Sequence, residues 1–439
     1  MSSSPSLNVA IIGAGYAGLA CAAALAQQGI PTTVFERASI LGGRARLVRN
    51  AAYEIDNGQH LLIGAYTELL RLMRVVGASP KTLETRPLHL LTPGQLEIKA
   101  ARLPAPLHLA LGLLRAKGLL WADKLALLRL MQYLKARHYR LEEDVSVRTL
   151  LTQTGQTPKL TEHFWAPLCV AALNTVYEEA SAQIFANVLR DSLGAYAHAS
   201  HFLLPRKDLT ELFPVPAARY LATRKGNIHI ATPISSIEAL PQGGYRLGGD
   251  PQALSYSHLV IATAPYHVDK LLSSHPAAET CLTHIRALQY NAITTLYLHF
   301  ESAPALPAPM IGLADGPVQF IFDRGQFYQQ PGLWAAVISA PPEPNLSHDV
   351  LIEQVLIQIN TQLSLNLPKP DWTQIITEKR ATFACTPGLK RPNMETGLPQ
   401  VYLAGDYVAG DYPATLEGAV RAGLACAKAI LPAKGSTPA

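Results

Sequence analysis

The stretch FERASILGGRAR, from Phe35 to Arg46, is the most informative about the fold of this 439-residue chain. Its acidic residue, Glu36, ends a short hydrophobic run, and the pair Gly42-Gly43 and Arg44 follow soon after. An acid at the end of a strand is typical of nucleotide-binding α/β proteins, in which it accepts hydrogen bonds from a ribose. The second glycine pair and the nearby cation indicate a site that extends beyond that ribose.

The residues before this stretch predict a strand, a tight turn, a helix and a second strand. Residues 9–12 are apolar, residues 17–28 are rich in alanine and leucine, and residues 32–35 are β-branched or aromatic. Between the first strand and the helix lies the spacing G-x-G-x-x-G, which permits a turn, a close approach of pyrophosphate and tight helix packing. The alternative is an α/β core that binds nothing. We predict a dinucleotide site that comprises Gly13, Gly15, Tyr16, Ala17, Gly18, Glu36 and Arg37.

The loop after the second strand bears on which dinucleotide is bound. NAD needs little from this loop, whereas FAD carries a ribityl chain and a three-ring flavin that the loop must also contact. Gly43 would let the backbone come close to the cofactor. Arg44 would neutralise pyrophosphate charge or hydrogen-bond along the ribityl chain. Taken alone, this loop fits a solvent-exposed turn with two surface arginines equally well.

The C-terminal stretch VYLAGDYVAGDYPATLEGAVRAGLACAKAI, residues 401–430, favours FAD. It predicts a short buried strand over 401–404, followed by Asp406, whose carboxylate would accept from a ribityl hydroxyl. A helix of small residues is expected to begin near Thr415. Its first amides, near Leu416, would then face the pyrimidine carbonyl of the flavin, where negative charge collects on reduction. An ordinary terminal helix is the alternative.

Together, the glycine turn with Glu36, the G-G-R loop and the C-terminal A-G-D and P-x-T-x-E-G-A motifs resemble the amine oxidase and carotenoid desaturase superfamily of flavoproteins. The resemblance implies FAD, and it places backbone near Ile234 at the adenine and Ala262 near the pyrophosphate. It also matches EIDNGQHLLIGAY, residues 54–66, to a turn beside the flavin, where Gly58 allows close approach and Gln59 and His60 line the ring. His60 could equally be a buried histidine bonded to a backbone carbonyl.

We therefore expect an α/β fold, with a Rossmann-type FAD-binding domain like that of the amine oxidases and a discontinuous α+β substrate domain. The expected FAD-binding segments are 1–80, 216–275 and 391–439. A helical part, 81–215, and a sheet part, 276–390, would form the substrate domain. No second G-x-G-x-x-G indicates a separate nicotinamide domain.

Composition sets further limits. Hydrophobic residues make up 49% of the chain and charged residues 16%, which is apolar for a protein without membrane spans. The five cysteines have no C-x-x-C spacing, so we expect no disulfide, no zinc site and no internal dithiol relay. We expect no other metal site. With no recognisable leader and no long uncharged apolar run, the expected location is the cytoplasm, with contact at the inner face of the cell membrane.

That membrane contact is expected from the stretch 99–140, which is unusually basic. Nine lysines and arginines face one acid, Asp123, so the stretch carries +8 while the whole chain carries +5. Leucines are interleaved with these cations, which is typical of a basic amphipathic helix or helix pair at a lipid surface. The leucines argue against nucleic acid as the partner. A helical subdomain with core leucines and solvated cations is the alternative.

Three further segments, DNGQHLLIGAY, residues 165–193 and residues 203–221, resemble the hydroxysqualene dehydroxylase family of bacterial hopanoid pathways. The resemblance implies that reduced FAD converts hydroxysqualene to squalene with loss of water, so an external electron donor is required. Proton-donor candidates are His60, Asp191 and Asp208, each of which could instead be structural. The alternatives are a carotenoid-type desaturase, a flavin amine oxidase and an FAD-bound lipid carrier without enzymatic activity. The sequence shows no recognisable counterpart of the aromatic cage and lysine-bound water that are usual in amine oxidases.

Overall fold

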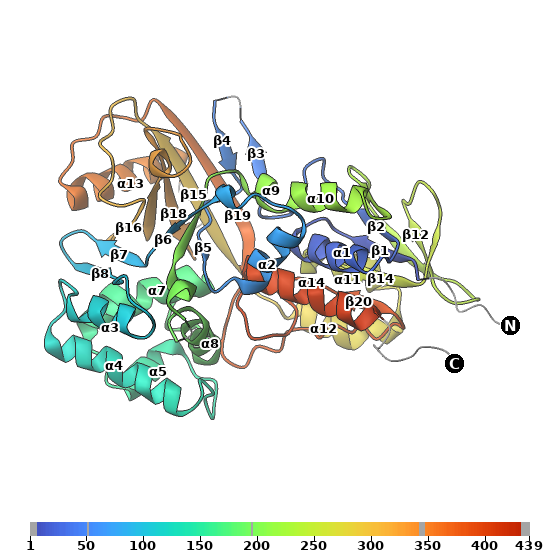
Figure 1. The fold of residues 1–439 in the computed structure, drawn as a ribbon, viewed down its shortest axis with the longest axis horizontal. Coiled ribbons are helices and arrows are strands. Elements are labelled where there is room, and N and C mark those ends of the chain that lie inside the picture. The colour runs from blue at the N-terminus through green and yellow to red at the C-terminus, as the bar shows by residue number, and fades with distance from the viewer. Residues whose placement is uncertain (1–6, 51, 195, 342–346, 432–439) are drawn as a thin grey trace.

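The computed structural model describes residues 7–50, 52–194, 196–341 and 347–431. One lobe is built on a parallel five-stranded sheet with the strand order β10-β2-β1-β14-β20. Segments almost 400 residues apart in the chain meet in this sheet, and Figure 1 shows it at the end of the molecule opposite α13. The strands are β1 (Val9–Ile12), β2 (Thr32–Phe35), β10 (Gly226–His229), β14 (His258–Ile261) and β20 (Val401–Leu403).

Small residues let two helices pack closely beside this sheet. Helix α1 (Tyr16–Gln27) contacts α14 (Leu416–Ile430), and Figure 1 shows them side by side. A Cβ on Gly423 would lie 2.1 Å from the carbonyl oxygen of Ala17, so only glycine permits this approach. The N-termini of both helices reach the same region, since Tyr16 at the start of α1 and Leu416 at the start of α14 line one cavity.

The remaining elements of this lobe flank the sheet. Helices α2 (Thr67–Val75) and α10 (Pro214–Ala222) pack on α14 and α1, respectively. A small antiparallel sheet and two helices follow β10 and β14 along the chain. These are β11 (Ser236–Ala239), β12 (Tyr245–Gly248), β13 (Ser255–Tyr256), α11 (Pro265–Leu272) and α12 (Glu279–Arg286).

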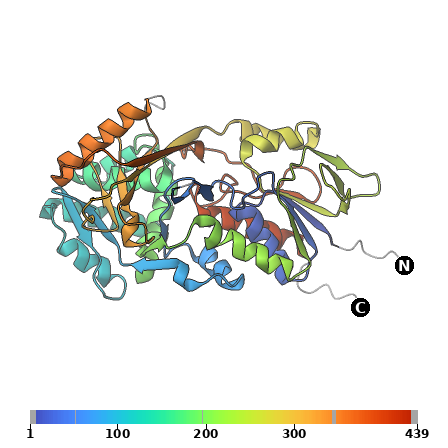
Figure 2. The same cartoon turned by 90° about the horizontal axis from the view of Figure 1, so that it is seen from above.

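The second lobe contains an antiparallel five-stranded sheet with the order β16-β17-β18-β15-β19. Helix α13 (His348–Leu363), capped by Ser347, buries Val355 and Ile359 against this sheet. Figure 2 shows these elements and the helices that follow β8 at the same end of the elongated molecule. The strands are β15 (Tyr290–His299), β16 (Met310–Gly312), β17 (Phe320–Asp323), β18 (Leu333–Ser339) and β19 (Trp372–Phe383).

The expectation that 81–215 is helical is partly wrong. Helices α3 (Leu107–Leu114), α4 (Trp121–Ala136), α5 (Val147–Gln153), α6 (Pro158–Leu160), α7 (Ala166–Leu173), α8 (Ala182–Ser192) and α9 (Leu209–Leu212) do lie there. The segment also contains β6 (Leu83–Arg86), β7 (His89–Thr92), β8 (Leu96–Lys99) and β9 (Phe202–Pro205). The run HLLTPGQLEIK forms the β7–β8 hairpin, since Pro93 and Gly94, with φ +74°, supply its turn. β9 pairs with β6 and with β5 (Leu62–Ile63), and so ties this segment to the first one.

The fold class expected from the sequence is confirmed, and the first strand, helix and second strand lie within one residue of their predicted bounds. The hairpin of β3 (Leu47–Arg49) and β4 (Glu54–Asp56) was not predicted. The division into domains by residue range stays a prediction. Among the described residues, no helix combines the length and apolar character that a membrane crossing requires.

Candidate functional site

One cavity of about 860 Å³ runs from the ends of the parallel strands into the second lobe. Of the predicted cofactor residues, all but Gly18 line it. Its two ends differ in chemistry. The first end is formed by the glycine turn, the loop after β2 and the N-termini of α1 and α14. The far end is apolar, with Leu88, Leu90, Phe202, Met310, Phe320 and Phe322 in its wall.

The three glycines of the turn have different structural roles. Gly13 has φ +114°, and a Cβ there would lie 2.6 Å from the Ala262 carbonyl oxygen. A Cβ on Gly18 would lie 2.0 Å from the Gly13 carbonyl oxygen, which explains why Gly18 serves packing and does not line the cavity. Gly15, in contrast, has φ −76° and leaves an open space, because the nearest heavy atom to its added Cβ is Gly43 Cα at 3.9 Å.

Glu36 is buried and holds the glycine turn in place. Its two carboxylate oxygens accept hydrogen bonds from the backbone N–H groups of Ala14 and Ala38, each at 2.8 Å. A carboxylate oxygen can accept more than one hydrogen bond, so Glu36 retains capacity for a ribose hydroxyl at the cavity wall. Beside it, Arg37 contacts the ring of His267 at 3.2 Å.

The second glycine pair brings the loop after β2 onto the first turn. The N–H of Gly42 donates to the Ala14 carbonyl at 2.9 Å, and Gly42 and Gly43 have φ values of +112° and +66°. Gly42 also bridges to Gly15. Side chains other than glycine rarely adopt such φ values, so the loop needs both glycines to form this wall of the cavity.

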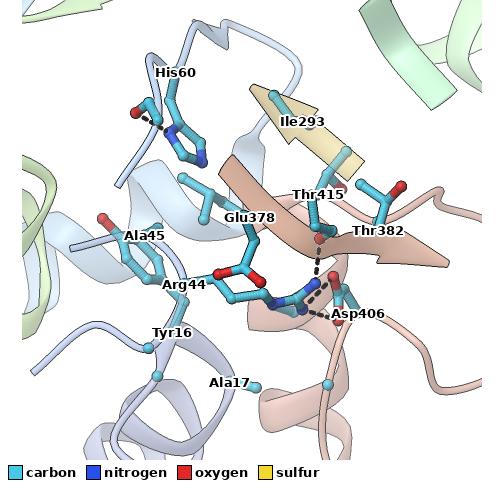
Figure 3. A pocket seen from close by; sticks show the side chains of 18 of the residues that line it. Tyr16, Ala17, Arg44, Ala45, His60, Ile293, Glu378, Thr382, Asp406 and Thr415 are labelled. Carbon is cyan, nitrogen blue, oxygen red and sulfur yellow. Dashed lines mark hydrogen bonds and ion pairs between the residues drawn. The ribbon is translucent and has the colours of Figure 1, made fainter. Parts of the chain in front are cut away.

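Arg44 is not a free cation. Its Nη2 donates to both carboxylate oxygens of Asp406, at 2.6 and 2.7 Å, and its Nη1 donates to the carbonyl of Ala381. Figure 3 shows this bridge, with Glu378 beside it. Burial lowers the pKa of Arg44, but the Asp406 carboxylate more than offsets this and raises it above its ordinary value. The pair therefore joins three distant segments at the cavity, a role that sequence spacing did not indicate.

His60 has a fixed tautomer. Its Nδ1 lies 3.0 Å from the Gly58 carbonyl oxygen, which can only accept, so Nδ1 carries the proton and Nε2 is an acceptor. Burial, helped by the Arg44 cation, lowers the pKa of His60, so the ring is neutral near pH 7. This geometry agrees with the alternative that His60 is a buried histidine bonded to a backbone carbonyl. A neutral ring whose proton is bonded to Gly58 is poorly suited to donate a proton to a substrate.

The two aspartates proposed as donors differ in position. Asp208 lies outside the cavity wall and caps α9, accepting from the N–H groups of Thr210 and Glu211. Its capping role explains its burial, so it is unsuited to donate a proton to a molecule in the cavity. Asp191 lines the cavity, where it accepts hydrogen bonds from Arg190 at 2.7 Å and from the Tyr412 hydroxyl at 2.7 Å.

Although burial raises the pKa of Asp191, its hydrogen bonds from Arg190 and Tyr412 hold that pKa below its ordinary value, so it is a carboxylate at neutral pH. Tyr412 was missed in the sequence, although it stands directly before the P-x-T-x-E-G-A motif. Other polar wall residues were missed as well: Tyr66, Asn174, Tyr266, Glu378 and Thr382. They come from separate elements, and no local spacing marks them.

The residues present fit FAD. The glycine turn, the N-terminus of α1 and Glu36 form a cradle for a ribose and a pyrophosphate. The buried hydroxyl oxygens of Thr263 and Tyr407 have no partner among the described residues, and both residues line the cavity. A polar ligand would supply such partners. Gly58, Gln59 and His60 would hold the flavin side, and Ile234 the adenine side.

Asp56 directly precedes the cavity residues Asn57 and Gly58. Its ionisation makes the stability of the folded protein depend on pH. Burial raises the pKa of Asp56 to about 7, despite the hydrogen bond that its Oδ1 accepts from Leu209 at 2.9 Å. Because this folded-state pKa lies above the unfolded value of about 3.9, the Asp56 contribution is greatest at low pH and is lost as the pH rises toward 7.

We therefore expect Asp56→Asn to gain about 2 kcal/mol in unfolding free energy relative to the wild type between pH 5.5 and 7.5. Urea unfolding of the FAD-loaded proteins measures this difference, with Asp315→Asn, in the loop between β16 and β17, as the control. A pH-independent difference would show that Asp56 is ionised throughout.

The chain has full-length relatives among curated proteins. A hydroxysqualene dehydroxylase of Rhodopseudomonas palustris is 31% identical over 98% of this chain and 99% of its own. The Zymomonas mobilis protein of the same name is 27% identical over 96% and 98%. A zeta-carotene desaturase of Arabidopsis thaliana is 23% identical over 95% of this chain and 84% of its own. The resemblances stated above are thus confirmed.

Solved structures share the fold. An oxidoreductase from Methanosarcina mazei has a TM-score of 0.74 at 16% identity, covering 96% of this chain and all of its own. Cyclohexylamine oxidase from Brevibacterium oxydans has a TM-score of 0.65 at 19% identity, covering 97% and 99%. The family model of flavin-containing amine oxidoreductases matches residues 16–431. The chain therefore belongs to the flavin-containing amine oxidoreductases, and FAD is its cofactor.

Proposed function

We propose that this flavin oxidoreductase removes the hydroxyl group of hydroxysqualene reductively, releasing squalene and water. The observation that carries the proposal is the full-length similarity to relatives of that name, at 31% and 27% identity. The cavity supports it, because its apolar far end suits a long hydrocarbon chain while a few polar side chains gather elsewhere in its wall.

The reaction balances with one hydride and one proton. Bound FAD in its reduced form supplies the hydride, that is, two electrons and one hydrogen. At the substrate, the carbon–oxygen bond breaks, a carbon–hydrogen bond forms, and the departing hydroxide takes up a proton to become water. Because the reductant is consumed, an external electron donor must restore it after each turnover.

The proton has a candidate source in Tyr412. Burial and the hydrogen bond to Asp191 raise the pKa of Tyr412, so the phenol keeps its proton at neutral pH. Hydroxide is the conjugate base of water, whose pKa is about 15.7, and a phenol remains the stronger acid. Arg421, which is paired with Glu417, lies 4.8 Å from the centre of the Tyr412 ring, and its charge would partly offset the repulsion between a phenolate and the Asp191 carboxylate.

Asp191 and His60 would position this chemistry. The Tyr412 hydroxyl donates its one proton to Asp191, which Arg190 holds, so the O–H bond must turn from Asp191 toward the substrate before the proton is transferred. The free Nε2 of His60 is an acceptor, suited to orient a substrate hydroxyl beside the flavin. We therefore assign the proton to Tyr412 and keep His60 and Asp191 as positioning residues.

A carotenoid-type desaturase is the second candidate, favoured by the similarity to zeta-carotene desaturase over 95% of the chain. It would move hydride in the opposite direction, from the polyene to oxidised FAD. An amine oxidase and a lipid carrier without enzymatic activity are less well supported, since none of the curated relatives named above is either of these, and cyclohexylamine oxidase shares the fold at only 19% identity.

The direction of hydride transfer distinguishes these functions. The protein would be photoreduced anaerobically and mixed with hydroxysqualene, and the oxidised protein would be mixed with phytoene or with an amine. Recovery of the oxidised flavin spectrum with hydroxysqualene alone is the expected result. Bleaching of oxidised flavin by phytoene would establish a desaturase, bleaching by an amine would establish an amine oxidase, and no spectral change in any mixture would favour the carrier.

A further inference from the structure

Exposed large apolar side chains are concentrated in one short segment of the chain. Of thirteen such side chains in the described parts of the chain, seven lie between residues 103 and 128. We call this surface the α3–α4 face, and it comprises Leu103, Leu107, Leu114, Leu120, Trp121, Leu125 and Leu128. Scattered exposed leucines are normal on a protein surface, but a cluster of this density indicates a contact with something apolar.

Helical spacing shows that these side chains are not needed for the core. On α4, Trp121, Leu125 and Leu128 recur at i, i+4 and i+7, so they share one side of the helix. They are 67%, 58% and 42% exposed. Ala126, Leu130 and Leu134 occupy the other side and are buried. Because the inner side already packs the helix on the protein, the outer side is available for a partner.

The two helices are held together at the centre of this face. The ammonium group of Lys124 donates to the Leu114 carbonyl at the end of α3, at 2.8 Å, and it lies 5.3 Å from the centre of the Trp121 ring. Asp123 fixes the start of α4 by accepting from the N–H of Leu120 at 2.8 Å. The face is therefore a preformed surface, not a pair of independent helices.

Exposed cations occur in the same segment as the apolar residues. The stretch 99–140 carries a net +8, and its exposed cations include Arg102, Arg115, Arg129 and Lys135. We propose that the α3–α4 face docks on an anionic bilayer. Trp121 and the leucines enter the boundary between headgroups and acyl chains, and the cations lie at the lipid phosphates. Apolar contact alone would also fit a second copy of this chain. In such a dimer, however, the net charge of +8 on one copy would face the same charge on the other and repel it.

The opposite side of α3 lies near the apolar end of the cavity. His108 Nε2 is 3.5 Å from the Ser200 hydroxyl oxygen, and Ser200 lines the cavity. Leu109 packs with Leu88 and Phe202, which line the same end. Docking by the α3–α4 face would thus bring the membrane close to the apolar part of the cavity. That consequence for a lipid substrate rests on the proposed function, whereas the docking itself does not.

Vesicle co-sedimentation of the full-length, FAD-loaded protein tests the docking. We expect strong binding to vesicles that contain phosphatidylglycerol, weaker binding when the salt concentration is raised, and little binding to pure phosphatidylcholine. Equal binding to both vesicle types, or to neither, would overturn the proposal. Sedimentation velocity without lipid checks the rival occupant, because a dimer that dissociates in Trp121→Ser/Leu125→Ser would assign the face to a second copy.

Two pairs of substitutions separate the apolar and charged contributions. Trp121→Ser/Leu125→Ser removes two exposed side chains, so the melting temperature should stay near that of the wild type while binding falls at least about ten-fold. Ile357→Ser, at an exposed position on α13, is the matched control and should bind like the wild type.

Arg115→Glu/Lys135→Glu should also weaken binding to anionic vesicles at least about ten-fold. Lys207→Glu/Lys369→Glu, with the same change in net charge elsewhere on the surface, should have a much smaller effect. Lys117 and Lys124 are unsuitable targets, since they bond to Glu97 and Leu114. If the two double variants weaken binding equally, binding depends only on the net charge of the protein, and the α3–α4 face is not the docking surface. Detergent-solubilised hydroxysqualene checks activity independently, so the docking and the proposed function can fail separately.

Discussion

Tyr412→Phe is expected to slow the reoxidation of reduced enzyme by hydroxysqualene by about 10²–10⁴-fold, the usual cost of losing a general acid. The hydroxyl that is removed donates to Asp191 at 2.7 Å and lies in the cavity wall. Phenylalanine keeps the ring and its contact with Arg421. FAD content and melting temperature should therefore stay close to those of the wild type. Single-turnover absorbance at the flavin band measures the rate.

Two further variants make this test specific. Tyr220→Phe removes a hydroxyl outside the cavity and should leave the rate unchanged. Asp191→Asn keeps a hydrogen-bond acceptor for Tyr412 but removes the negative charge, so it should slow the reaction less than Tyr412→Phe does. A Tyr412→Phe enzyme with the wild-type rate would reject Tyr412 as the donor. Loss of FAD in that variant would show that the residue is structural.

Gly15→Ala is expected to weaken FAD binding about 5- to 150-fold, which corresponds to the 1–3 kcal/mol that overpacking typically costs. The added methyl group meets no protein atom closer than 3.9 Å, and φ at Gly15 is −76°, which alanine readily adopts. The cost therefore falls on the cofactor complex and not on the apoprotein. Fluorescence titration of apoprotein with FAD measures the affinity, and thermal unfolding of the apoprotein measures the fold.

Gly18→Ala is the contrasting substitution. Its methyl group would lie 2.0 Å from the Gly13 carbonyl oxygen, so the turn itself must shift and the apoprotein should lose stability. Gly410→Ala, with no heavy atom closer than 4.0 Å and outside the cavity, should change neither property. If Gly15→Ala binds FAD like the wild type, the pyrophosphate does not pass over Gly15.

Local signals account for the parts of the structure that the sequence predicted well. The glycine turn and Glu36 lie within 24 residues of one another, and their spacing alone places them at the C-terminal ends of two neighbouring strands. The helix start near Thr415 was predicted as well, and the structure shows that Thr415 caps this helix by a hydrogen bond within the first turn.

Long-range pairing explains what could not be predicted. Arg44 and Asp406 are 362 residues apart, and only the assembled sheet shows that they neutralise each other. Tyr412 and Asp191 meet in the same way across 221 residues. Asp208 was a proton-donor candidate in the sequence, but the structure shows that it caps the start of α9. The strands β6 to β9 were obscured by the helices that surround them in sequence.

The proposed reaction is the removal of a hydroxyl group from hydroxysqualene with reduced FAD as the hydride source. A single anaerobic turnover of the photoreduced enzyme with hydroxysqualene, followed by mass spectrometry of the extracted lipid, is its decisive measurement. We predict about one squalene per flavin oxidised, and none when the enzyme starts oxidised. Flavin that stays reduced while hydroxysqualene is recovered unchanged, or squalene that is consumed instead of formed, would contradict the claim.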